Sequence, residues 1–215
     1  MQKTWKYNTY SRKWNINMDK KVHYTWKDIE HMINVINNLM YADNWRPDYI
    51  VGMTRGGLVP AVMMSNITGI TMHALDVRFR DTDENYVGPE SNSWMAQDAY
   101  GYIPEDKRID IHTGFKVENG PTWDRTRKKN ILIIDDINDS GKTLNWIKED
   151  WLKSCMPNDP DWQHVWHNNV RFACLIDNGA SNFGDLDYTA LEINKEEDPT
   201  WIVFPWEGER DYGNF

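Results

Sequence analysis

Apolar positions along the chain follow two patterns, helical spacing and short continuous runs. Residues 25–40 show helical spacing, and Thr25 with Asp28 forms a capping arrangement at the start, so we predict a helix there. Short apolar runs predict strands at 49–53, 71–79, 131–136, 170–176 and 187–193. Further helices are expected at 58–67 and from about residue 143 to 152. Strands that alternate with helices predict an α/β fold with a central, mostly parallel sheet flanked by helices.

Long stretches between these elements lack a clear period. Residues 80–129 are rich in Asp, Asn, Gly, Pro and Tyr, and a long stretch of this kind inside a compact domain is often a lid or binding loop, or else disordered. Residues 156–169 are irregular as well, and 194–215 are aromatic and turn-rich. We therefore expect one domain, residues 1–215, with a mobile-loop insertion at 80–129 and a C-terminal flap at 194–215.

Charge and composition narrow the classes of function. The 215 residues include 24 Lys and Arg against 33 Asp and Glu, a net charge of −9, which argues against nucleic acid as the main partner. No apolar run approaches the ~18 residues of a membrane span, and the N-terminus has no signal-peptide pattern. We expect a cytoplasmic protein without a membrane segment. Two cysteines and the pair His164 and His167 define no strong metal site, although a zinc site stays open on histidine spacing.

The segment IIDDINDSGKT carries the clearest chemistry. Asp135 and Asp136 end an apolar strand, and the carboxyl ends of parallel strands are where such sheets bind ligands. Two neighbouring carboxylates accept hydrogen bonds from ribose hydroxyls, directly or through magnesium. The loop that follows enters a helix, whose first amides and dipole favour a phosphate. The expected phosphate cradle consists of Ser140, Gly141, Lys142 and Thr143.

The sequence Gly141-Lys142-Thr143 also matches the end of a nucleotide-binding Walker A loop. The first glycine of that motif would fall at position 136, which is Asp136. A carboxylate where a nucleotide phosphate must approach the backbone argues against an NTPase.

The motif ILIIDDINDSGKTL resembles the 5-phosphoribosyl-1-pyrophosphate (PRPP) site of type I phosphoribosyltransferases. The chain resembles bacterial xanthine–guanine phosphoribosyltransferases in four blocks, in the same order: 25–39, 47–61, 131–144 and 200–207. This resemblance implies the type I phosphoribosyltransferase fold and transfer of 5-phosphoribosyl from PRPP to a purine-type base, with release of pyrophosphate. It also implies Mg²⁺ as cofactor, a place in purine salvage, and a homo-oligomer, either dimer or tetramer.

The resemblance assigns roles to individual positions. Asp135 and Asp136 would bind the ribose and magnesium, and Asp139 would act as general base toward an imidazole nitrogen of the purine. Helix capping is the alternative for Asp139, and it can coexist with the catalytic role. In the tail, Trp201 would stack on the base and the backbone of Ile202 would read its edge; simple hydrophobic packing is the alternative for Trp201.

A second loop is assigned by the same resemblance. The pyrophosphate loop would be Thr54, Arg55, Gly56 and Gly57, with a non-proline cis peptide between the first two residues. Glycines there let backbone amides approach the leaving group, and the Arg55 guanidinium offers a multidentate phosphate contact. Without the downstream motif, this segment would be an ordinary strand-to-helix turn.

One position departs from the family pattern. Members of the family commonly carry a lysine after the strand that corresponds to 170–176, where it donates to the exocyclic oxygen of the purine. This chain has Asp177 and Asn178 there, so we expect Asn178 to contact the base without a charge. The accepted base therefore stays open. Two other functions stay open with it: a non-catalytic PRPP-binding regulatory protein, and a phosphoribosyltransferase for an unusual base.

Overall fold

A five-stranded parallel sheet forms the centre of the molecule in the computed structural model, which describes residues 20–77, 93–103, 105, 108 and 123–207. Its strand order is β3-β2-β4-β5-β6, and every neighbouring pair is parallel. The strands are β2 (Tyr49–Met53), β3 (Met72–Leu75), β4 (Ile131–Asn138), β5 (Val170–Asn178) and β6 (Tyr188–Ile193). All five predicted strands are therefore confirmed, with β3 ending earlier than expected.

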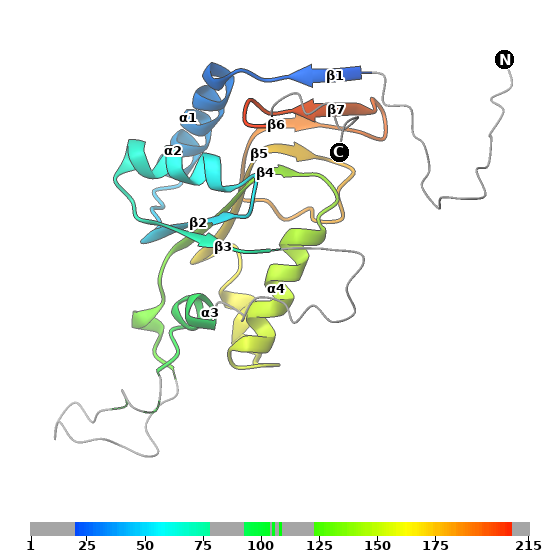
Figure 1. Ribbon diagram of the computed structural model, residues 1–215. Coiled ribbons are helices and arrows are strands. Elements are labelled where there is room, and N and C mark those ends of the chain that lie inside the picture. Colours follow the sequence, from blue (N-terminus) through cyan, green and yellow to red (C-terminus); the bar gives the residue numbers. More distant parts are fainter. Residues whose placement is uncertain (1–19, 78–92, 104, 106–107, 109–122, 208–215) are drawn as a thin grey trace, which may run out of the picture.

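Helices cover both faces of this sheet (Figure 1). One face packs against α1 (Trp26–Ala42) and α2 (Leu58–Thr68), the other against α3 (Ser93–Tyr100) and α4 (Lys142–Ser154). Successive side chains of β4 point to opposite faces of the sheet. Leu132 packs on the face covered by α1 and α2, and Ile133 packs on the face covered by α3 and α4. Both faces are buried, which is why β4 is a continuous apolar run until its carboxyl end.

The expected capping arrangement begins α1. The Thr25 hydroxyl accepts from the Asp28 amide at 3.3 Å, and the Asp28 carboxylate accepts from the Thr25 amide at 2.7 Å. These reciprocal bonds satisfy two amides that lack partners within the helix.

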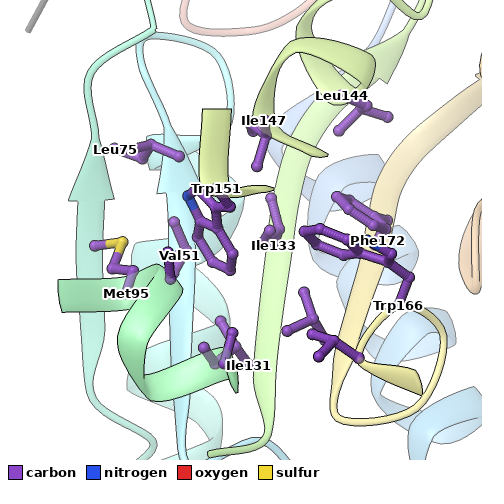
Figure 2. Packing of buried hydrophobic residues seen from close by; sticks show 14 of the residues in the cluster. Val51, Leu75, Met95, Ile131, Ile133, Leu144, Ile147, Trp151, Trp166 and Phe172 are labelled. Carbon is purple, nitrogen blue, oxygen red and sulfur yellow. The ribbon is translucent and has the colours of Figure 1, made fainter. Parts of the chain in front are cut away.

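The core beneath α4 is unusually aromatic (Figure 2). The Trp166 ring lies 5.8 Å from that of Phe172 and 6.1 Å from that of Trp151, measured between ring centroids. Trp162 stacks on Trp166 at 5.3 Å from the short 3₁₀ helix Pro160–His164. The irregular segment 156–169 is thus part of the core, and several of the 12 tryptophans supply core volume.

The segment 80–129 is not a loop throughout. Within it, α3 buries Met95, Ala96, Ala99 and Tyr100, and the Asn169 side chain donates to the Ala99 carbonyl at 2.9 Å. The sequence showed no period here because an eight-residue helix is too short to produce a clear one. A 3₁₀ helix, Arg125–Arg127, lies near the end of the segment. Residues 80–92 and 109–122 lie outside the described part of the chain.

A second, two-stranded parallel sheet joins β1 (Lys20–His23) to β7 (Thr200–Val203). Sequence patterns did not predict β1. Lys20 also forms an ion pair with Asp198. The start of the described chain therefore contacts the segment 194–207, which belongs to the predicted flap. Of that segment, residues 208–215 lie outside the described residues. None of the described helices has the length and apolar character needed to cross a bilayer.

Candidate active site

Two loops meet at the carboxyl ends of β2 and β4, which are neighbours in the sheet. A Cβ atom added to Gly56 would lie 1.9 Å from Oδ2 of Asp136, and one added to Gly57 would lie 2.3 Å from the Ile134 carbonyl oxygen. Side chains at these two positions would collide with β4. The glycines therefore allow the 54–57 loop to lie directly against the paired acids. The expected cis peptide between Thr54 and Arg55 is present.

Thr54 fastens this loop to the end of β3. Its hydroxyl donates to Oδ1 of Asp76 at 2.7 Å and accepts from the Val77 amide at 3.0 Å, while its own amide donates to the Leu75 carbonyl at 2.9 Å. Arg55, next to it, is exposed. Sequence reasoning missed Asp76, although an acid directly after an apolar run is the signal for the carboxyl end of a strand.

Asp135 and Asp136 share a partly buried position at the end of β4. Oδ1 of Asp135 accepts from the Asp136 amide at 2.9 Å, and Oδ1 of Asp136 accepts from the Ile137 amide at 2.8 Å. Burial raises the pKa of Asp135, and the neighbouring Asp136 carboxylate raises it further. Burial also raises the pKa of Asp136. Both shifts mean that the ionised pair is disfavoured in the unliganded protein, so a cation beside it would be stabilised.

The donor set at this point fits magnesium. Mg²⁺ prefers oxygen ligands and is commonly held by one or two carboxylates together with substrate phosphates. Asp135 and Asp136 provide two such carboxylates. Within the described ranges, no group of three or more His, Cys, Asp or Glu residues could hold a metal on its own, and this includes His164 and His167. An ion here would therefore need oxygens from a phosphorylated substrate to complete its coordination.

The loop before α4 is shaped for an anion. Gly141 has φ 77°, and a Cβ there would lie 2.5 Å from the Phe183 amide nitrogen, so both conformation and space require glycine. The N-cap residue, Gly141, has no side chain to cap the first turn of α4, and the Ser140 hydroxyl accepts from the Lys142 amide only at 3.5 Å. The leading amides of α4 are thus available to a phosphate. Ser140 and Lys142 are exposed, and they border an open hollow of about 310 Å³ that Trp146 also lines.

Asp139 is not the cap of α4, and its side chain contacts a lysine that follows β6. Oδ1 of Asp139 lies 2.8 Å from Nζ of Lys195, which follows β6. The Asp139 side chain is 56% exposed and can be reached by a substrate. The residue at the N-cap position of α4 is Gly141, so the capping alternative for Asp139 is not what the structure shows. No pattern in the sequence had marked Lys195.

Asn178 is buried, with 5% of its surface exposed. Its Nδ2 donates to the Asp139 carbonyl at 2.9 Å, and its Oδ1 accepts from the amides of Lys195 at 3.0 Å and Ala180 at 3.3 Å. These bonds already engage both ends of the amide group. The Asn178 side chain therefore joins the loop that carries Asp139 to the segment that carries Lys195.

Trp201 and Ile202 lie in β7, outside the five-stranded sheet that carries the acids and Asn178. Trp201 is 48% exposed, whereas Ile202 is buried in the core. Further along the tail, Phe204 and Trp206 stack with ring centroids 4.7 Å apart. An exposed tryptophan beside a buried aromatic tail is compatible with a stacking platform for a planar ligand.

Known proteins resemble the chain over most of its length. It is 28% identical over 163 residues to a xanthine-guanine phosphoribosyltransferase of Cereibacter sphaeroides, a match that covers 76% of this chain and 70% of that protein. A xanthine-guanine phosphoribosyltransferase of Roseobacter denitrificans is 26% identical over 164 residues, which cover 76% and 69% of the two chains.

Solved structures show the same fold. A purine phosphoribosyltransferase from Pyrococcus horikoshii superposes with a TM-score of 0.52 at 24% identity, over 87% of this chain and 94% of that one. A hypothetical protein from Neisseria gonorrhoeae, solved with bound ppGpp, gives 0.54 at 19% identity, over 89% and 91%. Residues 22–212 match the family described as "Phosphoribosyl transferase domain". The chain therefore belongs to the phosphoribosyltransferase family, enzymes of the pentosyltransferase class.

Proposed function

We propose that the protein transfers the 5-phosphoribosyl group of PRPP to a purine-type base and releases pyrophosphate. The contact between Gly56 and Asp136 carries this proposal, because it places a glycine loop suited to pyrophosphate directly on two acids suited to a ribose. The names of the two similar bacterial proteins support a purine as the acceptor.

Each part of PRPP has a matching group of residues. The backbone of Gly56 and Gly57 and the guanidinium of Arg55 would bind the pyrophosphate, as the amides before α4 would bind the 5′-phosphate. The ribose hydroxyls would donate to Asp135 and Asp136. This order, pyrophosphate loop, diol acids and phosphate loop, follows the sheet from β2 to β4 and its helix.

Magnesium, held by Asp135 and Asp136 together with substrate oxygens, would neutralise charge that builds on the pyrophosphate as it leaves. The raised pKa of both acids supports this assignment, since a cation relieves the penalty of keeping them ionised. Arg55 adds a second positive group on the leaving side.

The reaction is a displacement at the anomeric carbon. The bond from that carbon to pyrophosphate breaks and a bond to a ring nitrogen of the base forms, through an oxocarbenium-like transition state. As the base attacks, the proton on its imidazole ring passes to the Asp139 carboxylate, whose exposed side chain can reach a bound ligand. Trp201 would stack on the base, and the backbone of Ile202 would contact its edge.

A panel of bases tests the proposal. The purified protein is incubated with PRPP, Mg²⁺ and one base at a time, and both pyrophosphate and nucleotide are measured. Turnover of hypoxanthine, guanine or xanthine is expected. Tight PRPP binding without turnover of any base would favour a regulatory PRPP-binding protein, and turnover restricted to a non-purine base would favour an unusual acceptor. Light scattering of the same sample tests the proposed dimer or tetramer.

A further inference from the structure

Asn138 is a polar residue in the core, at the carboxyl end of β4 and next to the candidate site. Only 2% of its surface is exposed. Burial of a polar group is costly unless its hydrogen bonds are made, so the partners of Asn138 indicate what this side chain holds in place. These partners lie in β5 and in the loop between β5 and β6, residues 179–187, which we call the β5–β6 loop.

Both ends of the Asn138 side-chain amide are hydrogen-bonded. Its Nδ2 donates to Oδ1 of Asp177 and to the Phe183 carbonyl, both at 2.8 Å. Its Oδ1 accepts from the Ser181 hydroxyl, also at 2.8 Å. Because a carboxylate and a carbonyl can only accept, the NH₂ end must face Asp177 and Phe183, and this fixes the orientation of the amide. A buried network in which each partner is satisfied is directional and specifies one arrangement of the β5–β6 loop.

The part of the β5–β6 loop that these bonds hold lies directly against the loop before α4. A Cβ on Gly141 would lie 2.5 Å from the Phe183 amide nitrogen and 2.8 Å from Oγ of Ser181. The Phe183 amide donates to the same Oγ at 3.1 Å. Between these two residues, the Asn182 amide donates to the Ser140 carbonyl at 3.3 Å. A shift of the β5–β6 loop would therefore also shift the loop before α4 and the first amides of that helix.

We propose that Asn138 is a positioning residue for the 5′-phosphate of PRPP, because it holds the β5–β6 loop and thereby fixes the direction of the amides before α4. This inference rests on the proposed function. With 2% of its surface exposed, Asn138 cannot touch a substrate and acts through the loop. Several amides bind one phosphate together, so a small change in their direction weakens all of these bonds. An apolar side chain of similar size would fill the space but leave the Ser181 hydroxyl and the Phe183 carbonyl without this partner.

A general contribution to stability is the competing explanation. In that case, loss of Asn138 would lower the free energy of unfolding and affect every ligand alike. The positioning role predicts a selective loss, because the 54–57 loop follows β2, and β4 separates β2 from β5 in the sheet. Ribose 5-phosphate and inorganic pyrophosphate each represent one end of PRPP, so the two ligands distinguish the explanations.

Calorimetry measures the affinity of the wild type and of Asn138→Leu for ribose 5-phosphate and for inorganic pyrophosphate, both with Mg²⁺. Asn138→Leu should bind ribose 5-phosphate about 10- to 100-fold more weakly, the scale expected when a site is displaced by about 1 Å. Its affinity for pyrophosphate should change by less than about twofold, as for positions that do not interact.

Asn169→Leu is the matched control. Asn169 is also buried, and its Nδ2 donates to the Ala99 and Lys129 carbonyls at 2.9 Å, but it lies at the opposite end of β5. Its replacement removes the same chemical group from the core far from the loop before α4. Both affinities should stay at the wild-type values.

Ser181 gives an independent test, because its hydroxyl joins Asn138 to the β5–β6 loop. Ser181→Ala should weaken the binding of ribose 5-phosphate selectively, whereas Ser181→Thr keeps a hydroxyl and should restore it. Since both residues act through the same contact, the double variant Asn138→Leu/Ser181→Ala should lose no more affinity than the weaker-binding single variant.

Each outcome decides one question. An equal loss of affinity for both ligands in Asn138→Leu, or an unchanged affinity for ribose 5-phosphate, overturns the positioning role. If Asn138→Leu does not fold, as judged by circular dichroism, the two Ser181 variants decide, and equal affinities of Ser181→Ala and Ser181→Thr for ribose 5-phosphate speak against the proposal. A wild type that binds PRPP but not ribose 5-phosphate contradicts it as well. If the wild type neither binds PRPP nor turns over a base, the proposed function itself fails.

Discussion

The hydroxyl of Thr54 and the carboxylate of Asp76 form a 2.7 Å hydrogen bond that links the 54–57 loop after β2 to the end of β3. The same hydroxyl accepts from the Val77 amide at 3.0 Å. One side chain therefore sets the position of the loop relative to the sheet edge.

Replacing Thr54 by Val removes both bonds while keeping the shape of the side chain. We expect KM for PRPP to rise by about 5- to 100-fold, since leaving such partners unsatisfied costs about 1–3 kcal/mol. Thr54→Ser keeps the hydroxyl and should lose clearly less. Steady-state kinetics with varied PRPP measure both; equal values for the two variants would show that the hydroxyl does not position the loop.

Gly56→Ala tests the contact between the loop and the paired acids. A Cβ at this position would lie 1.9 Å from Oδ2 of Asp136, so the loop or the acid must move. A displacement of this size should lower kcat/KM by about 100-fold. Gly184→Ala is the control, because a Cβ there meets nothing within 4 Å. An active Gly56→Ala variant would place the pyrophosphate site elsewhere.

Asp139→Asn keeps the size of the side chain and removes the proton acceptor. Turnover should fall by about 10²- to 10⁴-fold, the usual effect of losing a general base, while the affinity for PRPP stays close to that of the wild type. Single-turnover kinetics and isothermal titration with PRPP separate the two quantities. A variant that turns over at the wild-type rate would remove Asp139 from the mechanism.

Asp135→Asn should make the protein more stable and less active. Burial raises the pKa of Asp135 in the folded state, so over the range from about pH 4 up to that raised value the folded protein holds a proton that the unfolded chain has lost. The free energy of unfolding of the wild type therefore falls as the pH rises through this range. Asparagine does not ionise, so the variant does not lose this part of its free energy of unfolding as the pH rises.

Thermal unfolding in EDTA measures the effect without metal. Relative to the wild type, Asp135→Asn should melt at a similar temperature near pH 4 and about 2–4 °C higher at pH 8, a shift of about 1 kcal/mol. Glu149→Gln, on the exposed side of α4, is the control for simple removal of a charge. A variant that is less stable than the wild type at pH 8 would contradict the prediction that ionised Asp135 destabilises the folded protein.

The sequence pattern was sufficient to predict the part of the candidate site whose residues are neighbours in the chain. The acids of β4 and the loop before α4 lie within 131–143, so a strand, its carboxyl end and a helix start could be predicted from neighbouring residues. The same holds for the cap of α1. The cis peptide before the glycines was implied by the resemblance and not by local pattern. Burial on both faces of a parallel sheet produces continuous apolar runs, and these are visible without a structure.

Only the tertiary structure decided the rest. It brought Lys195 to Asp139, joined Thr54 to Asp76, and connected Asn178 to the loops on either side of it. In the sequence, the members of each pair are separated by at least one helix that connects two parallel strands, so no local spacing relates them. The same cause hid β1, which gains its hydrogen bonds from β7 at the other end of the chain. Contacts of this kind depend on how the sheet is ordered, and a short polar segment contains no signal for that order.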